Sequence, residues 1–183
     1  MKPITATDLS PGALYTVAIR KFLMLYLLTG GGYLFYWSYR NWAAYKNATG
    51  AVITPVMRGL LWPFFILELF DKVQTGLDMR REPCQWHLET RALLIMLLVM
   101  FSVLLFTFFG QPSEIPFVYA VDAVLTVGTG CLFLGAQRAI NQLGSDPHGC
   151  GNSRVSWVNM GWMSAGVLAL VLVKYRVFMG CAG

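Results

Sequence analysis

One acidic residue lies where a carboxylate is costly to place. Asp122 is about two turns into an apolar stretch, residues 115–137, and Thr126 and Thr129 follow it on the same helical face. A charged group at that depth in a bilayer should face a bundle interior or a cavity. We therefore consider two roles for Asp122: an ion or proton relay, or a salt bridge to Arg58. The alternative is a protonated or hydroxyl-bonded carboxyl near the outer interface.

Glu68 is the third candidate for ion binding or relay, beside Asp122 and Arg58. It lies at the end of a less regular apolar stretch, residues 54–70. An acid inside a membrane segment indicates a functional site by default. At this position, however, the side chain can also simply reach the inner membrane surface.

A second group of residues could bind a metal ion. Cys84 and His87 lie in one connection between apolar stretches, and His148 and Cys150 lie in another that is expected on the same side. Two thiolates and two imidazoles form a tetrahedral zinc set. Against this, H-x-C is a tight spacing for two ligands of one ion, and no C-x-x-C is repeated. Zinc is thus a hypothesis, ordinary loop residues are the alternative, and no other cofactor is expected.

Signatures of catalysis are missing from the sequence. There is no G-x-S-x-G, H-E-x-x-H or nucleotide-binding loop, and only two histidines are present for acid–base work. The net charge of +5 comes from 14 Lys and Arg that are scattered at segment ends. There they set membrane topology and meet anionic headgroups. We therefore predict that the protein is not an enzyme and has no nucleic-acid partner.

Apolar stretches of membrane-spanning length position these candidates. Hydrophobic residues make up 56% of the 183 residues and charged residues 13%, well outside the usual balance of soluble domains. A helix of about 20 apolar residues crosses the hydrocarbon core. We predict an all-α membrane protein, residues 1–183 forming a single polytopic domain without a cleavable signal peptide. Its four transmembrane helices are expected at about 13–39, 92–110, 115–137 and 155–173.

The stretch at residues 54–70 is a weaker candidate for a span. Its seventeen residues would rise about 25 Å as a helix, which is short for a bilayer. It contains Arg58 and Glu68, and Pro63 removes a backbone hydrogen bond and favours a break or kink. We interpret it as a Pro-broken re-entrant segment; the alternative is a short, tilted fifth span.

Charge alone does not set the orientation. The connection at 111–115 has no Lys or Arg and should face outside, but the count of basic residues inside is the same with a re-entrant or a spanning segment. A faint repeat favours re-entry. Residues 30–40 and 128–138 both fit G-x-G-x-L-F-x-x-x-x-R. A shared direction for the two copies would place Arg40 and Arg138 together at the inner interface.

Aromatic residues gather around Arg40. Trp and Tyr are typical of membrane–water interfaces, where a basic side chain can anchor them. We expect an interfacial belt here, with a headgroup or ligand pocket as the alternative. The belt consists of Tyr36, Trp37, Tyr39, Arg40 and Trp42.

The same residues carry a resemblance to a known family. Residues 36–42, YWSYRNW, are similar to the Y-W-F-Y-[KR]-N-W signature of small bacterial inner-membrane proteins grouped as a domain of unknown function. The motif I-x-P-x-x-R follows at 53–58, and Q-R-A-I-N, N-S-R and W-V-N follow at 137–141, 152–154 and 157–159. Ser38 departs from the signature, which has Phe there. The resemblance implies a multi-pass protein of the bacterial inner membrane and assigns no activity.

The most consistent function is therefore that of a non-catalytic accessory or interaction protein. Its partners would be the lipid bilayer and another membrane protein, or a second copy of the chain. Gly161, Ala165 and Ala169 recur every four residues, a spacing that permits close helix contact in lipid, although a helix of the same chain would explain it too. The alternatives are a small transporter or channel component that uses intramembrane acids, and a membrane immunity protein against a membrane-active toxin.

Overall fold

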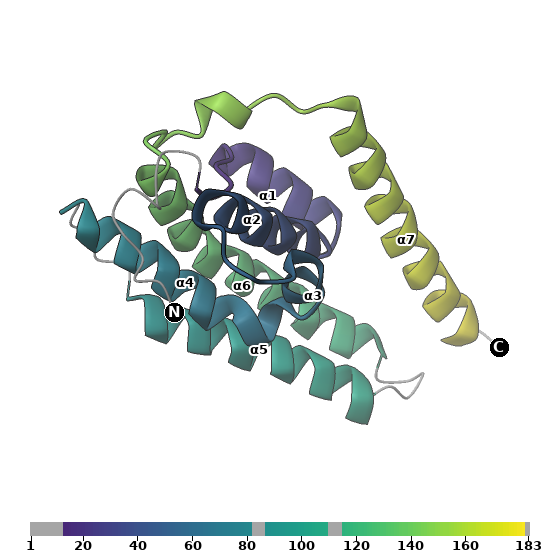
Figure 1. Ribbon diagram of the computed structural model, residues 1–183. Helices are drawn as coiled ribbons and strands as arrows, with labels where there is room; N and C mark the ends of the chain where they lie inside the picture. Colours follow the sequence, from purple (N-terminus) through teal and green to yellow (C-terminus); the bar gives the residue numbers. More distant parts are fainter. Residues whose placement is uncertain (1–12, 82–86, 110–114, 182–183) are drawn as a thin grey trace.

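The described part of the chain is entirely helical (Figure 1). The computed structural model describes residues 13–81, 87–109 and 115–181, and over these ranges it contains no strand. The prediction of an all-α fold is confirmed there. The elements are α1 (Ile19–Leu28), α2 (Tyr33–Thr49), α3 (Pro55–Leu60), α4 (Trp62–Met79), α5 (Leu88–Phe108), α6 (Ile115–Leu143), the short 3₁₀ turn η1 (Cys150–Asn152) and α7 (Trp157–Cys181).

The expected first span, 13–39, is not one helix but the larger part of a helical hairpin. Helix α1 ends at Leu28, and Gly30 and Gly31 take φ values of +57° and +85°, which a residue with a side chain rarely adopts. Helix α2 then runs back along α1. The ring of Phe22 lies 5.7 Å from that of Tyr33. The start of α1 and the end of α2 therefore lie at the same end of the bundle.

The two copies of the predicted repeat have different structures. Gly30 and Gly31 form the turn between α1 and α2, whereas Gly128 and Gly130 lie within α6. Gly130 instead allows a close approach: a Cβ there would lie 2.8 Å from the Tyr26 ring. The sequence similarity thus does not correspond to a structural repeat.

The segment at 54–70 is broken where Pro63 predicted a break. Helix α3 ends at Leu60, and Pro63 occupies the first turn of α4, where its missing N–H costs nothing. Helix α3 runs antiparallel to α2, and a Cβ on Gly59 would lie 2.7 Å from Cβ of Tyr39. Helix α4 runs the opposite way and continues to Met79. The chain therefore reverses at Leu61.

Contacts between the helices define two ends of the bundle. Tyr15 meets Asn41 of α2, Val17 meets Asn141 of α6, and Arg80 after α4 meets the carbonyl of Leu143. We call this the basic end, because Arg20 and Lys21 at the start of α1, Arg80 and Arg81 after α4, and Arg138 near the end of α6 lie there. The opposite end holds the turn at 29–32, the break at Leu61, the end of α5 and the start of α6.

Aromatic rings fill the core between these ends. Phe133 of α6 is fully buried, with four rings around it at centroid distances of 5.3 to 6.4 Å. Burying large rings supplies much of the apolar area that holds such a bundle together. The four rings are those of Phe22, Trp37, Trp62 and Phe70.

Two helices are long and apolar enough to cross a membrane. They are Leu88–Phe108 and Pro116–Leu143, and the apolar part of α7, Trp157–Leu172, is shorter. Only 17% and 22% of the most apolar windows of the two long helices are buried within the chain. A helix that is hydrophobic on all sides is either buried in a core or lies in lipid. The low burial favours lipid.

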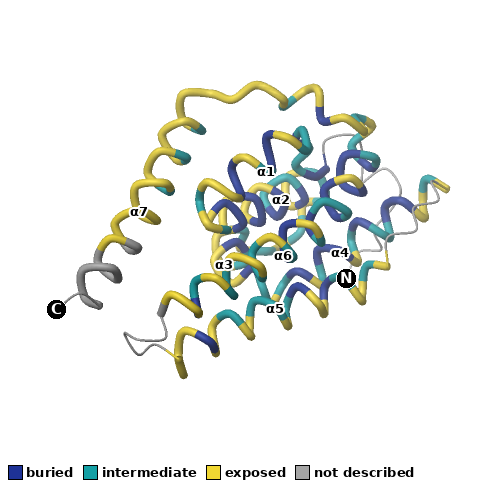
Figure 2. Tube along the Cα trace, turned by 180° about the vertical axis from the view of Figure 1, so that it is seen from behind, coloured by how far each residue is buried: buried dark blue, intermediate teal, exposed yellow. Residues whose placement is uncertain are grey.

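Helix α7 stands apart from the other helices (Figures 1 and 2). Among the described elements it packs on α1, and most of its described surface is exposed. The contact is narrow. Gly166 faces Leu28 and Thr29 so closely that a Cβ would lie 2.6 Å from the Leu28 carbonyl oxygen. The predicted small-residue stripe is only partly involved, since Gly161 has no neighbour within 4 Å.

Candidate functional site

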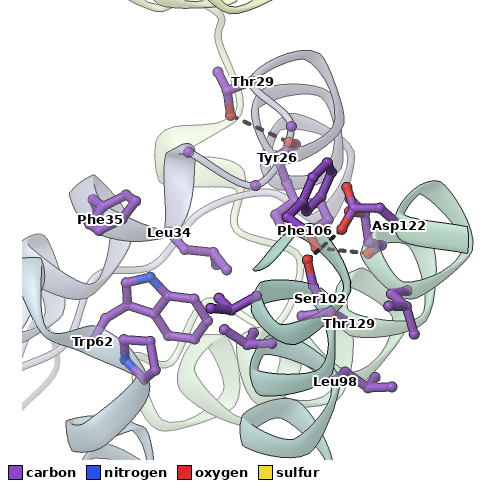
Figure 3. A pocket seen from close by; sticks show the side chains of 18 of the residues that line it. Tyr26, Thr29, Leu34, Phe35, Trp62, Leu98, Ser102, Phe106, Asp122 and Thr129 are labelled. Carbon is purple, nitrogen blue, oxygen red and sulfur yellow. Dashed lines mark hydrogen bonds between the residues drawn. The ribbon is translucent and has the colours of Figure 1, made fainter. Parts of the chain in front are cut away.

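Asp122 lines a cavity at the opposite end of the bundle, away from the basic end (Figure 3). The cavity has a volume of about 480 Å³. The turn between α1 and α2, the break between α3 and α4, and facing parts of α5 and α6 form its walls. Thr126 and Thr129 line it with Asp122, as their spacing on one face predicted. The polar side chains from the other elements are those of Tyr26, Thr29 and Ser102.

The Asp122 carboxylate is bonded to a hydroxyl. Ser102 Oγ of α5 donates to Asp122 Oδ1 at 2.5 Å, and Tyr26 Oη donates to the carbonyl of Thr126 at 2.7 Å. The Asp122 side chain is half-buried. This arrangement agrees with the hydroxyl-bonded alternative. The predicted salt bridge from Asp122 to Arg58 is not formed, because Arg58 has another partner.

Arg58 pairs with Glu68 across the break in the α3–α4 segment. Arg58 Nη1 lies 2.7 Å from Glu68 Oε1. The guanidinium also stacks over the Trp42 ring at 4.2 Å and the Phe65 ring at 4.9 Å. Such stacking stabilises a cation by about 0.5–2 kcal/mol. Neither Arg58 nor Glu68 lines the Asp122 cavity, so the three relay candidates do not share a path.

The expected aromatic belt is divided between core and surface. Tyr36, Tyr39 and Arg40 are exposed, and Arg40 donates to Tyr36 Oη at 2.8 Å. Trp37 and Trp42, however, are completely buried. The belt prediction is corrected for these two residues, because α2 turns one face to α6 and α3 and does not present all its rings outward.

Buried amides near the basic end form a site that the sequence reasoning missed. Asn141 of α6 donates to the carbonyl of Val17 at 2.9 Å and accepts from its N–H at 3.1 Å. Gln137 donates to Asn141 Oδ1 at 2.7 Å and accepts from Trp37 Nε1 at 2.6 Å. Asn41 accepts from the N–H of Tyr15 at 3.1 Å. We call Asn41, Gln137 and Asn141 the amide clamp, because they hold the extended segment before α1.

The connection between α6 and α7 extends this hold on the same segment. Asn152 donates to the carbonyl of Thr16 at 3.0 Å. Lys21 Nζ donates to Asn152 Oδ1 at 2.7 Å and to the carbonyl of Arg154 at 2.8 Å. Asn41, Gln137, Asn141 and Asn152 all belong to the motifs that carry the family resemblance. Those motifs could therefore have signalled a structural centre.

The zinc hypothesis concerns four residues, of which the structure describes three. Cys84 is outside the described residues. Of the other three, His148 and Cys150 lie in the connection after α6, while His87 precedes α5. No group of three or more His, Cys, Asp or Glu residues gathers within 13–81, 87–109 and 115–181. Because Cys84 is outside these ranges, the zinc hypothesis stays a prediction.

Comparison of the chain with protein-family models, with curated proteins and with solved structures finds no match. The resemblance to the inner-membrane family therefore stays a prediction.

Proposed function

We propose that this protein is a multi-pass protein of the bacterial inner membrane that acts by binding another membrane protein and not by catalysis. Helices α5, α6 and α7 would cross the bilayer. The α1–α2 and α3–α4 hairpins would enter from one side and return, which replaces the expected first span by a hairpin. The two long apolar helices and their low burial support this placement.

The clustering of Lys and Arg supports an orientation. The ends of α2, α4 and α6 and the start of α1 lie together and carry many of the basic residues. Cytoplasmic connections are enriched in Lys and Arg. We therefore place the basic end in the cytoplasm, with the Asp122 cavity nearer the outer face.

A groove beside α7 is the observation that most supports partner binding. It lies between α7 and the α1–α2 hairpin and has a volume of about 510 Å³. Its wall on α7 includes Ala165 and Ala169 of the predicted small-residue stripe, with Trp162 beside them. The narrow contact at Gly166 leaves this face of α7 uncovered.

The side chains along the groove favour a helix as its occupant. Small residues let a second backbone approach closely, and hydroxyl or amide side chains bond across helices in lipid. Ala165 and Ala169 supply the first property, while Thr29, Tyr36 and Asn159 on the same walls supply the second. Lipid chains would use only the apolar part of this surface. We propose that one transmembrane helix of a partner protein fills the groove.

Site-directed photocrosslinking in native membranes tests this proposal. A benzophenone amino acid replaces Trp162 in the groove or, as a control, Leu168, which lies away from it. We expect a single adduct from position 162 whose crosslinked peptide is a transmembrane segment of another protein. Ala165→Leu should abolish it, and Ala123→Leu, on the exposed face of α6, should not. Adducts with lipid alone, or with a second copy of this chain, would contradict the proposal.

A small transporter or channel component is the second candidate, favoured by the Asp122 carboxylate in its cavity. Transport through this site needs a carboxylate that titrates or coordinates an ion. Asp122→Asn keeps an acceptor for Ser102 but removes the charge. If the relay operates, purified protein in vesicles should carry a solute or proton flux that Asp122→Asn abolishes. Absence of flux with the wild-type protein, or flux unchanged by the substitution, would rule out the relay.

A further inference from the structure

A second cavity opens at the basic end of the bundle. It has a volume of about 630 Å³ and lies where the start of α1, the end of α6 and the connection to α7 come together. Its polar or charged lining residues are Arg20, Lys21, Arg138, His148 and Ser153. The remaining lining comes from Ala18, Ile19, Met24, Pro147 and Val155. No Asp or Glu is among these residues.

The cations in this cavity have no acidic partner among the residues that the structure describes. Arg20 and Arg138 are exposed at the cavity wall. The ion pairs found among the described residues, Arg58–Glu68 and Lys72–Asp71, involve neither of them. Three cationic side chains, those of Arg20, Lys21 and Arg138, therefore line one cavity without an acid among its lining residues.

Lys21 adds to this excess of positive charge, and its charge is costly because the side chain is buried. Its exposure is only 5%, and its hydrogen-bond acceptors are all neutral: Asn152 Oδ1, the carbonyl of Arg154 and the amide oxygen of Asn159. Buried charges are normally paired with an opposite charge, since desolvation is otherwise uncompensated. Three neutral acceptors satisfy the N–H groups of Lys21 but do not neutralise its charge, which an anion in the adjacent cavity would compensate.

Asp146 interacts electrostatically with His148, but its carboxylate already accepts hydrogen bonds from backbone amides. Its Oδ1 accepts from the N–H of Cys150 and its Oδ2 from the N–H of Gly151, both at 2.9 Å. These amides hold the carboxylate within its own loop. Asp146 is not among the residues that line the cavity.

The rest of the lining indicates the source of the anion. Met24 lies one turn after Lys21 on α1 and is 46% exposed, and Val155, which is also exposed, lines the same cavity. Cations at the membrane boundary with apolar residues beside them match a phosphate attached to acyl chains. We propose that this cavity binds the phosphate group of an anionic phospholipid, held by Arg20, Lys21 and Arg138. The proposal rests on the membrane placement above, not on the partner helix.

Lipid retention by the purified full chain tests the site. The protein in a neutral detergent is mixed with dioleoylphosphatidylglycerol or dioleoylphosphatidylcholine, and bound lipid is counted by native mass spectrometry. We expect preferential retention of the phosphatidylglycerol. Arg20→Gln and Arg138→Gln should each weaken it about fivefold, as expected for one basic side chain near an anionic lipid. The matched control is Arg81→Gln, an exposed arginine outside the cavity, and it should bind as the wild-type protein does.

The remaining outcomes decide against the proposal in distinguishable ways. Equal retention of the two lipids, combined with binding of inorganic phosphate that the same two substitutions weaken, would assign the site to free phosphate and overturn the lipid. Equal phosphatidylglycerol binding by all four proteins would overturn the site itself. Lys21→Met is not used, because it can disturb the contacts to Asn152. None of these results depends on whether a partner helix occupies the groove beside α7.

Discussion

Two regions of this molecule are held to the bundle by different physics. In the amide clamp, Asn141 makes three hydrogen bonds in a fully buried site and fixes an extended segment distant in sequence. At α7, Gly166 has no side chain, which allows its backbone to lie against the backbone of Leu28 and Thr29. Polar satisfaction in a closed site gives rigidity, whereas a single close approach leaves most of a helix surface unused. The amide clamp is therefore a region that stabilises the fold, whereas α7 offers an uncovered surface to a partner.

The clamp should give the largest loss of stability when it is broken. Asn141→Ala leaves the N–H and carbonyl of Val17 and one N–H of Gln137 without their buried partner. Each unsatisfied group costs roughly 1–3 kcal/mol, so we expect the free energy of unfolding to fall by about 4 kcal/mol. Denaturant titration in detergent micelles measures it. Asn47→Ala, on the exposed side of α2, is the control and should change it by less than about 0.5 kcal/mol.

A loss below about 1 kcal/mol for Asn141→Ala would contradict this account of the clamp. It would mean that water reaches Val17 and replaces the amide, so that the region would be no more constrained than α7.

The elements of the fold differ in how far the sequence predicts them. Pro63 removes a backbone donor, and this local chemistry predicted the break in the α3–α4 segment. The turn at Gly30 and Gly31 was missed because a run of glycines is compatible both with a tight helix crossing and with a reversal. Nothing local distinguishes the two. The reversal depends on tertiary contacts, namely those of Phe22 with Tyr33 and of Tyr15 with Asn41.

The candidate sites show the same limit. The depth of Asp122 in an apolar stretch and the threonines after it predicted a shared cavity, because they depend on helical spacing alone. The salt bridge considered for Arg58 was one to Asp122; the reversal at Leu61 brings Glu68 to Arg58 instead, and that reversal is tertiary. Trp37 and Trp42 looked interfacial by type, and only the packing of α2 shows that they are buried.

Substitutions at two glycines on α7 should change stability less than breaking the clamp does, and they test how α7 is held. Gly166→Ala puts a methyl group 2.6 Å from the Leu28 carbonyl, so the backbones must separate. Overpacking of this kind costs about 1–3 kcal/mol. Gly161→Ala, with nothing within 4 Å, should lose no stability and should favour the helix slightly. Unfolding free energies of the two variants, measured in the same detergent, provide the test. Equal values would mean that α7 does not rest on α1 at Gly166.

The loop that joins the two regions should show the smallest effect, and it should depend on pH. Hydrogen bonds from the N–H groups of Gly151 and Cys150 lower the pKa of Asp146 below its ordinary value of 3.8. A depressed pKa means that the folded loop favours the ionised carboxylate. The stabilisation is therefore complete above about pH 4 and is lost as the pH falls through the lowered pKa.

Asp146→Ala removes this contribution at every pH, which makes the variant the internal reference. Amide hydrogen exchange at Cys150 and Gly151, read by mass spectrometry, should be faster in the variant than in the wild-type protein at neutral pH. The ratio of the two rates should approach one as the solution is acidified, because the protonated carboxyl no longer holds the amides as strongly. The effect should be small, because the side chain is open to solvent and salt screens it. A rate ratio that does not change with pH would show that the loop is held by its backbone, through bonds such as Gly149 N–H to the Asp146 carbonyl at 2.8 Å, and not by the carboxylate.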